Sequence, residues 1–146
     1  KNFLKTILRL SAERDQLKIV SDQWGAPTSS EAIANAVSQL LTRWKMPDQT
    51  HSGVYHFTNT GSTSWYGFAK AILKAYESQA AQYALPSLKI CADAIVPIAN
   101  AEYPTPAARP ANSRLDNTKL LSTFGVTLPA WETSLQAVMQ QIQEFD

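Results

Sequence analysis

The stretch Asp22-Gln23-Trp24-Gly25-Ala26-Pro27-Thr28-Ser29-Ser30-Glu31 joins a turn to the start of a helix, and the fold prediction extends outward from it. Gly25 and Pro27 are turn residues, and a hydroxyl residue three positions before a glutamate forms a capping box, which predicts Thr28 as the N-cap. A β-prone run, Leu17 to Val20, comes before the turn and predicts a short strand. Behind the turn, apolar residues at helical spacing predict one buried stripe: Ile33, Val37, Leu40, Leu41 and Trp44.

Three more helices follow from apolar residues that recur every three or four positions. They are expected to begin near Phe3, near Trp65 and after Pro129. A shorter helix is expected from Leu115 to Phe124, capped by Asp116 and stopped at Gly125. Each of these segments has polar residues on its other side, which is typical of helices that pack on a core.

Two further runs are rich in strand-forming residues, Gly53–Phe57 and Leu88–Cys91. The first leads into an expected loop at Asn59-Thr60-Gly61-Ser62. From Pro97 to Arg114 the chain has four prolines and no apolar period, which predicts a long loop. The sequence therefore predicts a mixed α/β fold of helices with a few short strands, formed as one domain over residues 1–146.

Composition restricts the class of function. Thirteen basic and twelve acidic side chains give a formal net charge of +1, too balanced for a protein that mainly binds nucleic acid or an anionic membrane. The chain has no apolar run of the roughly 18 to 20 residues that span a bilayer. The single cysteine, Cys91, allows no internal disulfide, and the cytoplasm is the expected compartment.

Tyr66 and Lys70 form a Tyr-x-x-x-Lys pattern, the spacing with which short-chain dehydrogenases pair a proton-donating tyrosine with a lysine. Such an enzyme also needs a glycine-rich turn that cradles the pyrophosphate of its cofactor. The five glycines of this chain lie too far apart to form one. We therefore interpret Tyr66 and Lys70 as a chance match and expect no catalytic and no cofactor-binding residue in this chain.

Other catalytic and metal chemistry has little support. The two histidines, His51 and His56, have no Cys, Asp or Glu at a metal-ligand spacing, so no metal site is expected. No Gly-x-Ser-x-Gly elbow is present, and Cys91 has no basic neighbour in sequence that would activate it.

The segment from Thr105 to Arg114 is the best candidate for an anion site. Arg109 and Arg114 offer planar guanidinium groups that match phosphate oxygens, and Asn112 and Ser113 lie between them. The alternative is that one arginine pairs with a carboxylate and fixes the loop, and both interpretations stay open.

Five segments together resemble one protein family, in order along the chain: Asn2-Phe3, Asp22–Thr28, Gly53–His56, Ser64–Ala69 and Arg109–Leu115. They are similar to the C-terminal half of the dTDP-4-dehydrorhamnose reductases, which are extended short-chain dehydrogenases. This resemblance implies a small substrate-binding domain. It also implies that the N-terminal Rossmann half, which holds NADPH and the catalytic Tyr-Lys pair, is missing from this chain. The start at Lys1, without a leader, fits that expectation.

By this resemblance the parent enzyme reduces dTDP-4-dehydro-β-L-rhamnose to dTDP-L-rhamnose with NADPH, for cell-surface polysaccharide, and this chain alone is inactive. Its expected partners are the dTDP-sugar, its own Rossmann half and a second copy in a homodimer, while a divalent metal stays open. The resemblance implies that the substrate is bound by six residues: Asn2, Gln23, Thr28, Arg109, Asn112 and Ser113.

Two alternatives remain. A non-catalytic relative, such as the regulatory subunit of methionine adenosyltransferase, would keep the fold and lose the catalytic pair. A sugar-nucleotide epimerase or dehydratase of the same superfamily would bind a similar ligand, although its C-terminal half is usually longer.

Overall fold

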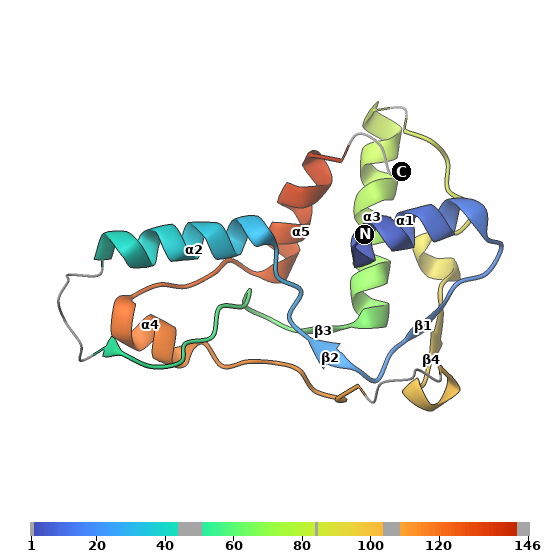
Figure 1. Cartoon of the computed structure of the whole chain (residues 1–146). Helices are drawn as coiled ribbons and strands as arrows, with labels where there is room; N and C mark the ends of the chain where they lie inside the picture. The colour runs from blue at the N-terminus through green and yellow to red at the C-terminus, as the bar shows by residue number, and fades with distance from the viewer. Residues whose placement is uncertain (1, 44–50, 84, 104–108, 143–146) are drawn as a thin grey trace.

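The computed structural model describes residues 2–43, 51–83, 85–103 and 109–142 (Figure 1). Its elements in chain order are α1 (Phe3–Glu13), β1 (Lys18–Val20), β2 (Trp24–Gly25), α2 (Ser30–Arg43), β3 (Thr63–Ser64), α3 (Trp65–Tyr83), the 3-10 turn η2 (Ala92–Ala94), β4 (Val96–Ile98), the 3-10 turn η3 (Asn100–Glu102), α4 (Thr118–Phe124) and α5 (Trp131–Gln140). The expected mixed α/β fold, with helices dominating and strands short, is confirmed.

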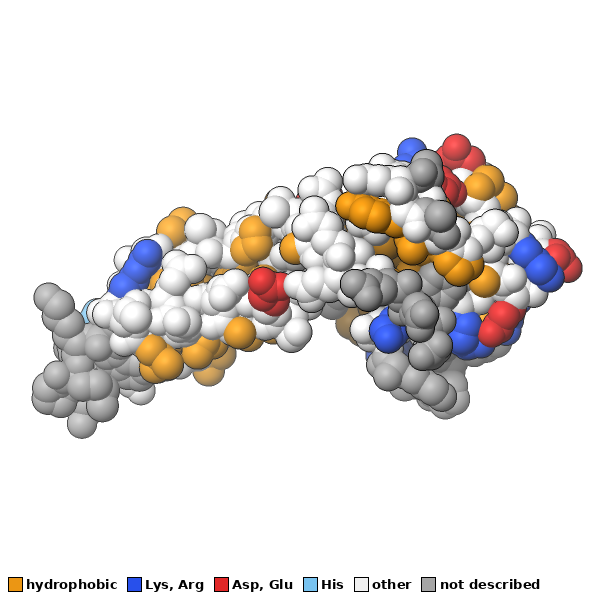
Figure 2. All heavy atoms as spheres, turned by 90° about the horizontal axis from the view of Figure 1, so that it is seen from above, with side chains coloured by type: hydrophobic (Ala, Val, Ile, Leu, Met, Phe, Trp, Pro, Cys, Tyr) orange, Lys and Arg blue, Asp and Glu red, His pale blue; other side chains and the backbone are white. Residues whose placement is uncertain are grey.

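The buried side chains form two clusters in an elongated molecule (Figures 1 and 2). The larger cluster lies where α1, α3 and α5 meet beside β1 and β4, and it includes Leu8, Ile72 and Met139. The smaller cluster joins α2 to α4 in the arm that projects to one side, with Leu120 and Val126 at its centre. None of the described helices is both long and apolar enough to cross a membrane.

Two small sheets connect these elements. β1 pairs in parallel with β4, with Lys18 opposite Val96 and Val20 opposite Ile98. β2 pairs antiparallel with β3, with Trp24 opposite Ser64. The strand expected at Leu17–Val20 is confirmed as β1.

The strand predictions for residues 53–57 and 88–91 are both wrong. The first segment has no regular secondary structure and pairs with none of the described strands, and its aromatic residues Tyr55 and Phe57 pack on the smaller cluster instead. The second is bent and leads into η2. The strand that does pair with β1 is β4, inside the predicted long loop. Pro97 hid it from the sequence pattern, and a proline is tolerated there because β4 lies in a sheet of only two strands.

Helix α2 forms where predicted, but its buried face differs from the prediction. Ala32 and Ala36 are buried against the smaller cluster, whereas Ile33 (39% exposed) and Val37 (38%) are partly exposed and Leu41 (64%) lies mostly in solvent. Small alanine side chains let the helix approach its neighbours closely. Trp44, the last member of the expected stripe, lies outside the described residues.

The cap of α2 is also one residue later than predicted. The Ser29 Oγ accepts a hydrogen bond from the backbone N–H of Ala32 (3.1 Å), so Ser29 caps the helix. The Thr28 hydroxyl is used elsewhere, because it donates to the carbonyl oxygen of Ala26 (2.9 Å) and accepts from the N–H of Asn59 (3.1 Å).

Helix α4 begins at Thr118 rather than at Leu115. The Asp116 Oδ1 accepts from the Thr118 hydroxyl (2.6 Å) and from the Thr118 N–H (2.8 Å), in part as predicted, and these two bonds lower the pKa of the Asp116 carboxyl. The helix ends at Gly125 as predicted, with φ at +65°, a left-handed conformation that glycine adopts without strain.

The position of the α2 cap leads to a stability prediction. Ser29→Ala should lower the free energy of unfolding by about 1 kcal/mol, because it removes the acceptor for the Ala32 N–H. Ser30→Ala, one residue further on, should have little effect because alanine is a good residue inside a helix. Urea unfolding of both variants measures the difference, and an equal loss in both would place the cap elsewhere.

Candidate functional site

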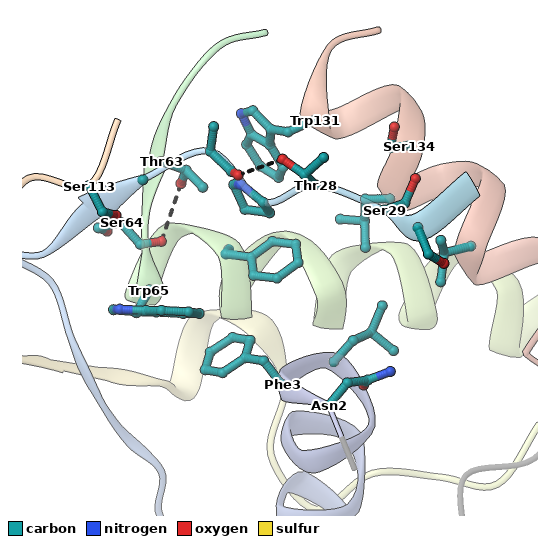
Figure 3. A pocket seen from close by; sticks show the side chains of 18 of the residues that line it. Asn2, Phe3, Thr28, Ser29, Thr63, Ser64, Trp65, Ser113, Trp131 and Ser134 are labelled. Atoms are coloured by element: carbon teal, nitrogen blue, oxygen red, sulfur yellow. Dashed lines mark hydrogen bonds between the residues drawn. The ribbon is translucent and has the colours of Figure 1, made fainter. Parts of the chain in front are cut away.

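A cavity of about 520 Å³ opens at the junction between the two clusters (Figure 3). Its wall comes from the start of α1, from residues 25–30, which we call the strap, from the start of α3, from Ser113 and from α5. The described residues that line it include no Lys, Arg, His, Asp or Glu. They are Asn2, Phe3, Leu4, Gln23, Gly25, Ala26, Pro27, Thr28, Ser29, Ser30, Thr63, Ser64, Trp65, Phe68, Ser113, Trp131, Ser134, Leu135 and Val138.

Four helices begin at this wall, and three of them start at a polar cap: α1 at Phe3, α2 at Ser30 and α3 at Trp65. The fourth, α5 at Trp131, has no side-chain cap. Asn2 Oδ1 accepts from the N–H of Lys5 (2.9 Å), and Ser64 Oγ accepts from the N–H of Gly67 (3.1 Å), as Ser29 does for α2. The N-terminus of a helix carries partial positive charge and N–H groups without a helical acceptor, so it favours anions. The cavity is thus suited to a negative group even though its lining has no cationic side chain.

Aromatic side chains form the other chemical part of the wall (Figure 3). The ring centroids of Phe3 and Trp65 are 4.7 Å apart, and those of Phe3 and Phe68 are 5.6 Å apart. Phe68 meets Trp131 edge to face at 5.9 Å. Trp131 is almost buried, but Trp65 is 45% exposed and presents apolar surface that a flat ring could cover.

The edge of the cavity is a three-segment sheet. Trp24 pairs with β3 on one side and with residues 111–113 on the other, where its N–H donates to Ala111 O (2.9 Å). Ser113 donates to the carbonyl oxygen of Trp24 from both N (2.9 Å) and Oγ (3.0 Å). The approach is so close that a Cβ at position 25 would lie 2.8 Å from the Ser113 Oγ, which is why glycine occurs there.

Four of the six residues predicted to bind substrate line this cavity: Asn2, Gln23, Thr28 and Ser113. Asn2 and Thr28 already use their side chains within the wall, as described above. Gln23 is buried, and its Nε2 donates to Asn100 Oδ1 (2.9 Å), which ties the turn to η3. Their bonds orient the wall, and only part of each side chain is available to a ligand.

The other two, Arg109 and Asn112, are exposed and are not among the lining residues. Asn112 Oδ1 accepts from both the N–H (3.1 Å) and the Nε (2.9 Å) of Arg114, so one of the two candidate arginines is held by an amide. The first part of the predicted anion segment, residues 105–108, lies outside the described residues.

Tyr66 and Lys70, the Tyr-x-x-x-Lys match, do not line the cavity. The Lys70 Nζ lies 2.9 Å from the Asp93 Oδ1 on η2, and this hydrogen-bonded ion pair raises the pKa of Lys70 and lowers that of Asp93. Lys70 therefore has a structural partner on the surface, which is consistent with the interpretation of the pattern as a chance match.

The pairing can be checked by titration. Lys70→Met should raise the pKa of the Asp93 carboxyl toward its ordinary value of 3.8, because the bond that favours the charged form is lost. Tyr66→Phe should leave that pKa unchanged. NMR of the carboxyl carbons between pH 2 and 6 measures both, and an unchanged Asp93 in Lys70→Met would contradict the pairing.

The described residues do not build a cradle for NADP. In a dinucleotide fold a parallel strand runs through a glycine-rich turn into a helix. Here the parallel strand β1 runs instead into the turn at 21–23, where the Ser21 hydroxyl donates to Ile98 O at the end of β4 and the Asp22 carboxylate accepts from the Asn100 N–H. Within the described ranges, no group of three or more His, Cys, Asp or Glu side chains could hold a metal ion.

The sequence interpretation missed the aromatic part of the wall. Phe3, Trp65, Phe68 and Trp131 all lie on apolar helical stripes, a pattern that predicts packing in a core. The available signal was their position, since Phe3, Trp65 and Trp131 are each the first residue of a helix, where a large apolar side chain lies at the edge of the packed face.

Known proteins resemble this chain over nearly its whole length. The family model described as the RmlD substrate binding domain matches residues 1–144. A dTDP-4-dehydrorhamnose reductase of Burkholderia thailandensis is 46% identical over 134 residues, which cover 90% of this chain and 43% of that protein.

Two solved structures are also similar. The dTDP-4-dehydrorhamnose reductase of Bacillus anthracis in complex with NADP has a TM-score of 0.74 at 31% identity, covering 97% of this chain and 44% of that one. The orthologue from Clostridium acetobutylicum has a TM-score of 0.79 at 30% identity, covering 99% and 45%. The chain thus spans less than half the length of these relatives.

Proposed function

Because the chain belongs to the RmlD substrate binding domain family, we propose that it is the substrate-binding part of a dTDP-4-dehydrorhamnose reductase. Its role would be to hold a dTDP-sugar, the substrate that is reduced to dTDP-L-rhamnose. The reductase name of the relatives supports this function over a regulatory subunit or an epimerase.

The observation that carries the proposal is the start of three capped helices at one uncharged cavity with an aromatic wall. A nucleotide sugar has three chemically different parts. Its diphosphate matches the N–H groups and caps at the helix starts, and its flat base matches the exposed face of Trp65. Its sugar hydroxyls match the Ser and Thr side chains of the strap and of β3.

The chain would supply binding rather than chemistry. Its described residues offer no cradle for NADP, so we assign no step of the reduction to them. We propose that the NADPH site and the catalytic Tyr-Lys pair belong to a Rossmann half outside these 146 residues. The Bacillus anthracis relative, of which this chain covers 44%, is in complex with NADP, which supports this proposal. A cytoplasmic location and a homodimer stay predictions, and a divalent metal stays open.

Binding measured by calorimetry on the 146-residue chain tests the proposal. dTDP should bind, and thymidine should bind at least about tenfold more weakly, since the loss of charge-assisted hydrogen bonds to the diphosphate costs 1.4 kcal/mol or more. NADPH should give no binding at the same concentration. No binding of dTDP at millimolar concentration, or equal affinity for thymidine, would contradict the assignment.

We further propose that Arg109 approaches the diphosphate from the edge of the cavity, because it lies two residues before Ala111 in the segment that pairs with Trp24. In the whole reductase, Arg109→Ala should raise the substrate KM by about tenfold or more with no matching change for NADPH. Arg14→Ala, an exposed arginine at the far end of α1, is the matched control. A substrate KM that stays the same in Arg109→Ala would remove this residue from the site.

A further inference from the structure

The segment Asn59-Thr60-Gly61 lies between two parts of the cavity wall and belongs to neither of them. On one side is the strap, with Pro27 and Thr28, and on the other is the start of α5, with Trp131 (Figure 3). Asn59 is only 2% exposed, and neither Asn59 nor Gly61 lines the cavity. From the sequence this segment is an ordinary loop.

On the strap side, Asn59 makes two bonds. Its Nδ2 donates to the carbonyl oxygen of Pro27 (3.0 Å), and its backbone N–H donates to the Thr28 Oγ1 (3.1 Å). Because the Thr28 hydroxyl also donates to Ala26 O, three consecutive strap residues are fixed through one buried asparagine.

The Oδ1 of Asn59 has no hydrogen-bond partner among the described residues, although it is buried. A buried acceptor without a partner destabilises the fold. The presence of asparagine at this position is therefore explained by its donor group, which reaches Pro27.

On the other side, the segment pairs with the start of α5. Thr60 N–H donates to Pro129 O (3.0 Å), and Trp131 N–H donates to Thr60 O (3.1 Å). Gly61 then turns the chain with φ at +81°, and a Cβ built there would lie 3.1 Å from Cδ1 of the Trp131 indole. Because Gly61 has no side chain, the Trp131 indole can lie directly against its backbone.

We propose that Asn59 and Gly61 are positioning residues that set the strap and the Trp131 indole relative to one another, and thereby set the affinity of the cavity for the nucleotide part of its substrate. The ligand named here rests on the proposed function. The two residues touch no ligand themselves. They act through Thr28 and Trp131.

Gly61→Ala tests the indole side, with Gly125→Ala as its matched control. Gly125, at the end of α4, also has a positive φ (+65°), and a Cβ there would lie 3.2 Å from the guanidinium of Arg43, the last residue of α2, which does not line the cavity. Both variants should lower Tm by a similar few degrees. Only Gly61→Ala should weaken dTDP binding, by about tenfold, at a temperature where circular dichroism shows both folded.

Asn59→Ala tests the strap side, with Asn117→Ala as its control. Asn117 holds Thr58, the residue before Asn59, in the same manner. Its Nδ2 donates to Thr58 O and its Oδ1 accepts from the Thr58 N–H, but Asn117 reaches no part of the wall. Asn59→Ala should weaken dTDP binding several-fold, while Asn117→Ala should bind within twofold of the unchanged chain.

The NMR resonance of the Trp131 indole N–H, assigned with Trp131→Phe, gives a readout without ligand. It should move in Gly61→Ala and stay in place in Gly125→Ala. If the unchanged chain does not bind dTDP, the proposed function fails, and the affinity part of this inference fails with it, whatever the indole resonance shows. If the unchanged chain binds dTDP but each variant binds as its control does, the inference alone is overturned.

Discussion

The backbone of Gln23, Trp24 and Gly25 holds together three segments that are far apart in the sequence, and the geometry of the cavity depends on this pairing. Trp24 is bonded to residues 111–113 on one side and to β3 on the other, while Trp65 N–H donates to Gln23 O (3.3 Å). Because α3 begins directly after β3 and α2 begins after the strap, the same few hydrogen bonds fix the starts of both helices. A change that opens this pairing would alter the cavity wall even where it leaves the helices intact.

A cavity built in this way can attract an anion without a cationic lining. Helix starts and hydroxyl groups present fixed donors. When a ligand binds to them, no conformational entropy of a long flexible side chain is lost. The aromatic wall adds apolar surface next to those donors. This pairing of neutral donors with flat rings suits a ligand whose charge lies beside a base, and under the proposed function it would hold the diphosphate although the net charge of the chain is only +1.

Much of the fold could be predicted from the sequence, because helical stripes and strong caps act locally. The errors have physical causes. The alternating pattern at 53–57 reflects packing of Tyr55 and Phe57 on a cluster rather than strand pairing, and Pro97 concealed β4. Among the cavity residues, Gln23, Thr28 and Ser113 could be predicted because they lie in segments that resemble the reductase family. The aromatic wall could not, because periodicity does not distinguish a core ring from one that lines a cavity at a helix start.

The most direct test of the central claim is a map of the backbone amide resonances of this chain during titration with dTDP. The account predicts the largest changes at the first-turn amides of α1, α2 and α3, together with the indole of Trp65, because these groups would meet the diphosphate and the base. Changes confined to the exposed Arg109–Arg114 segment, or spread over the outer face of α2 at Ile33 and Val37, would contradict it.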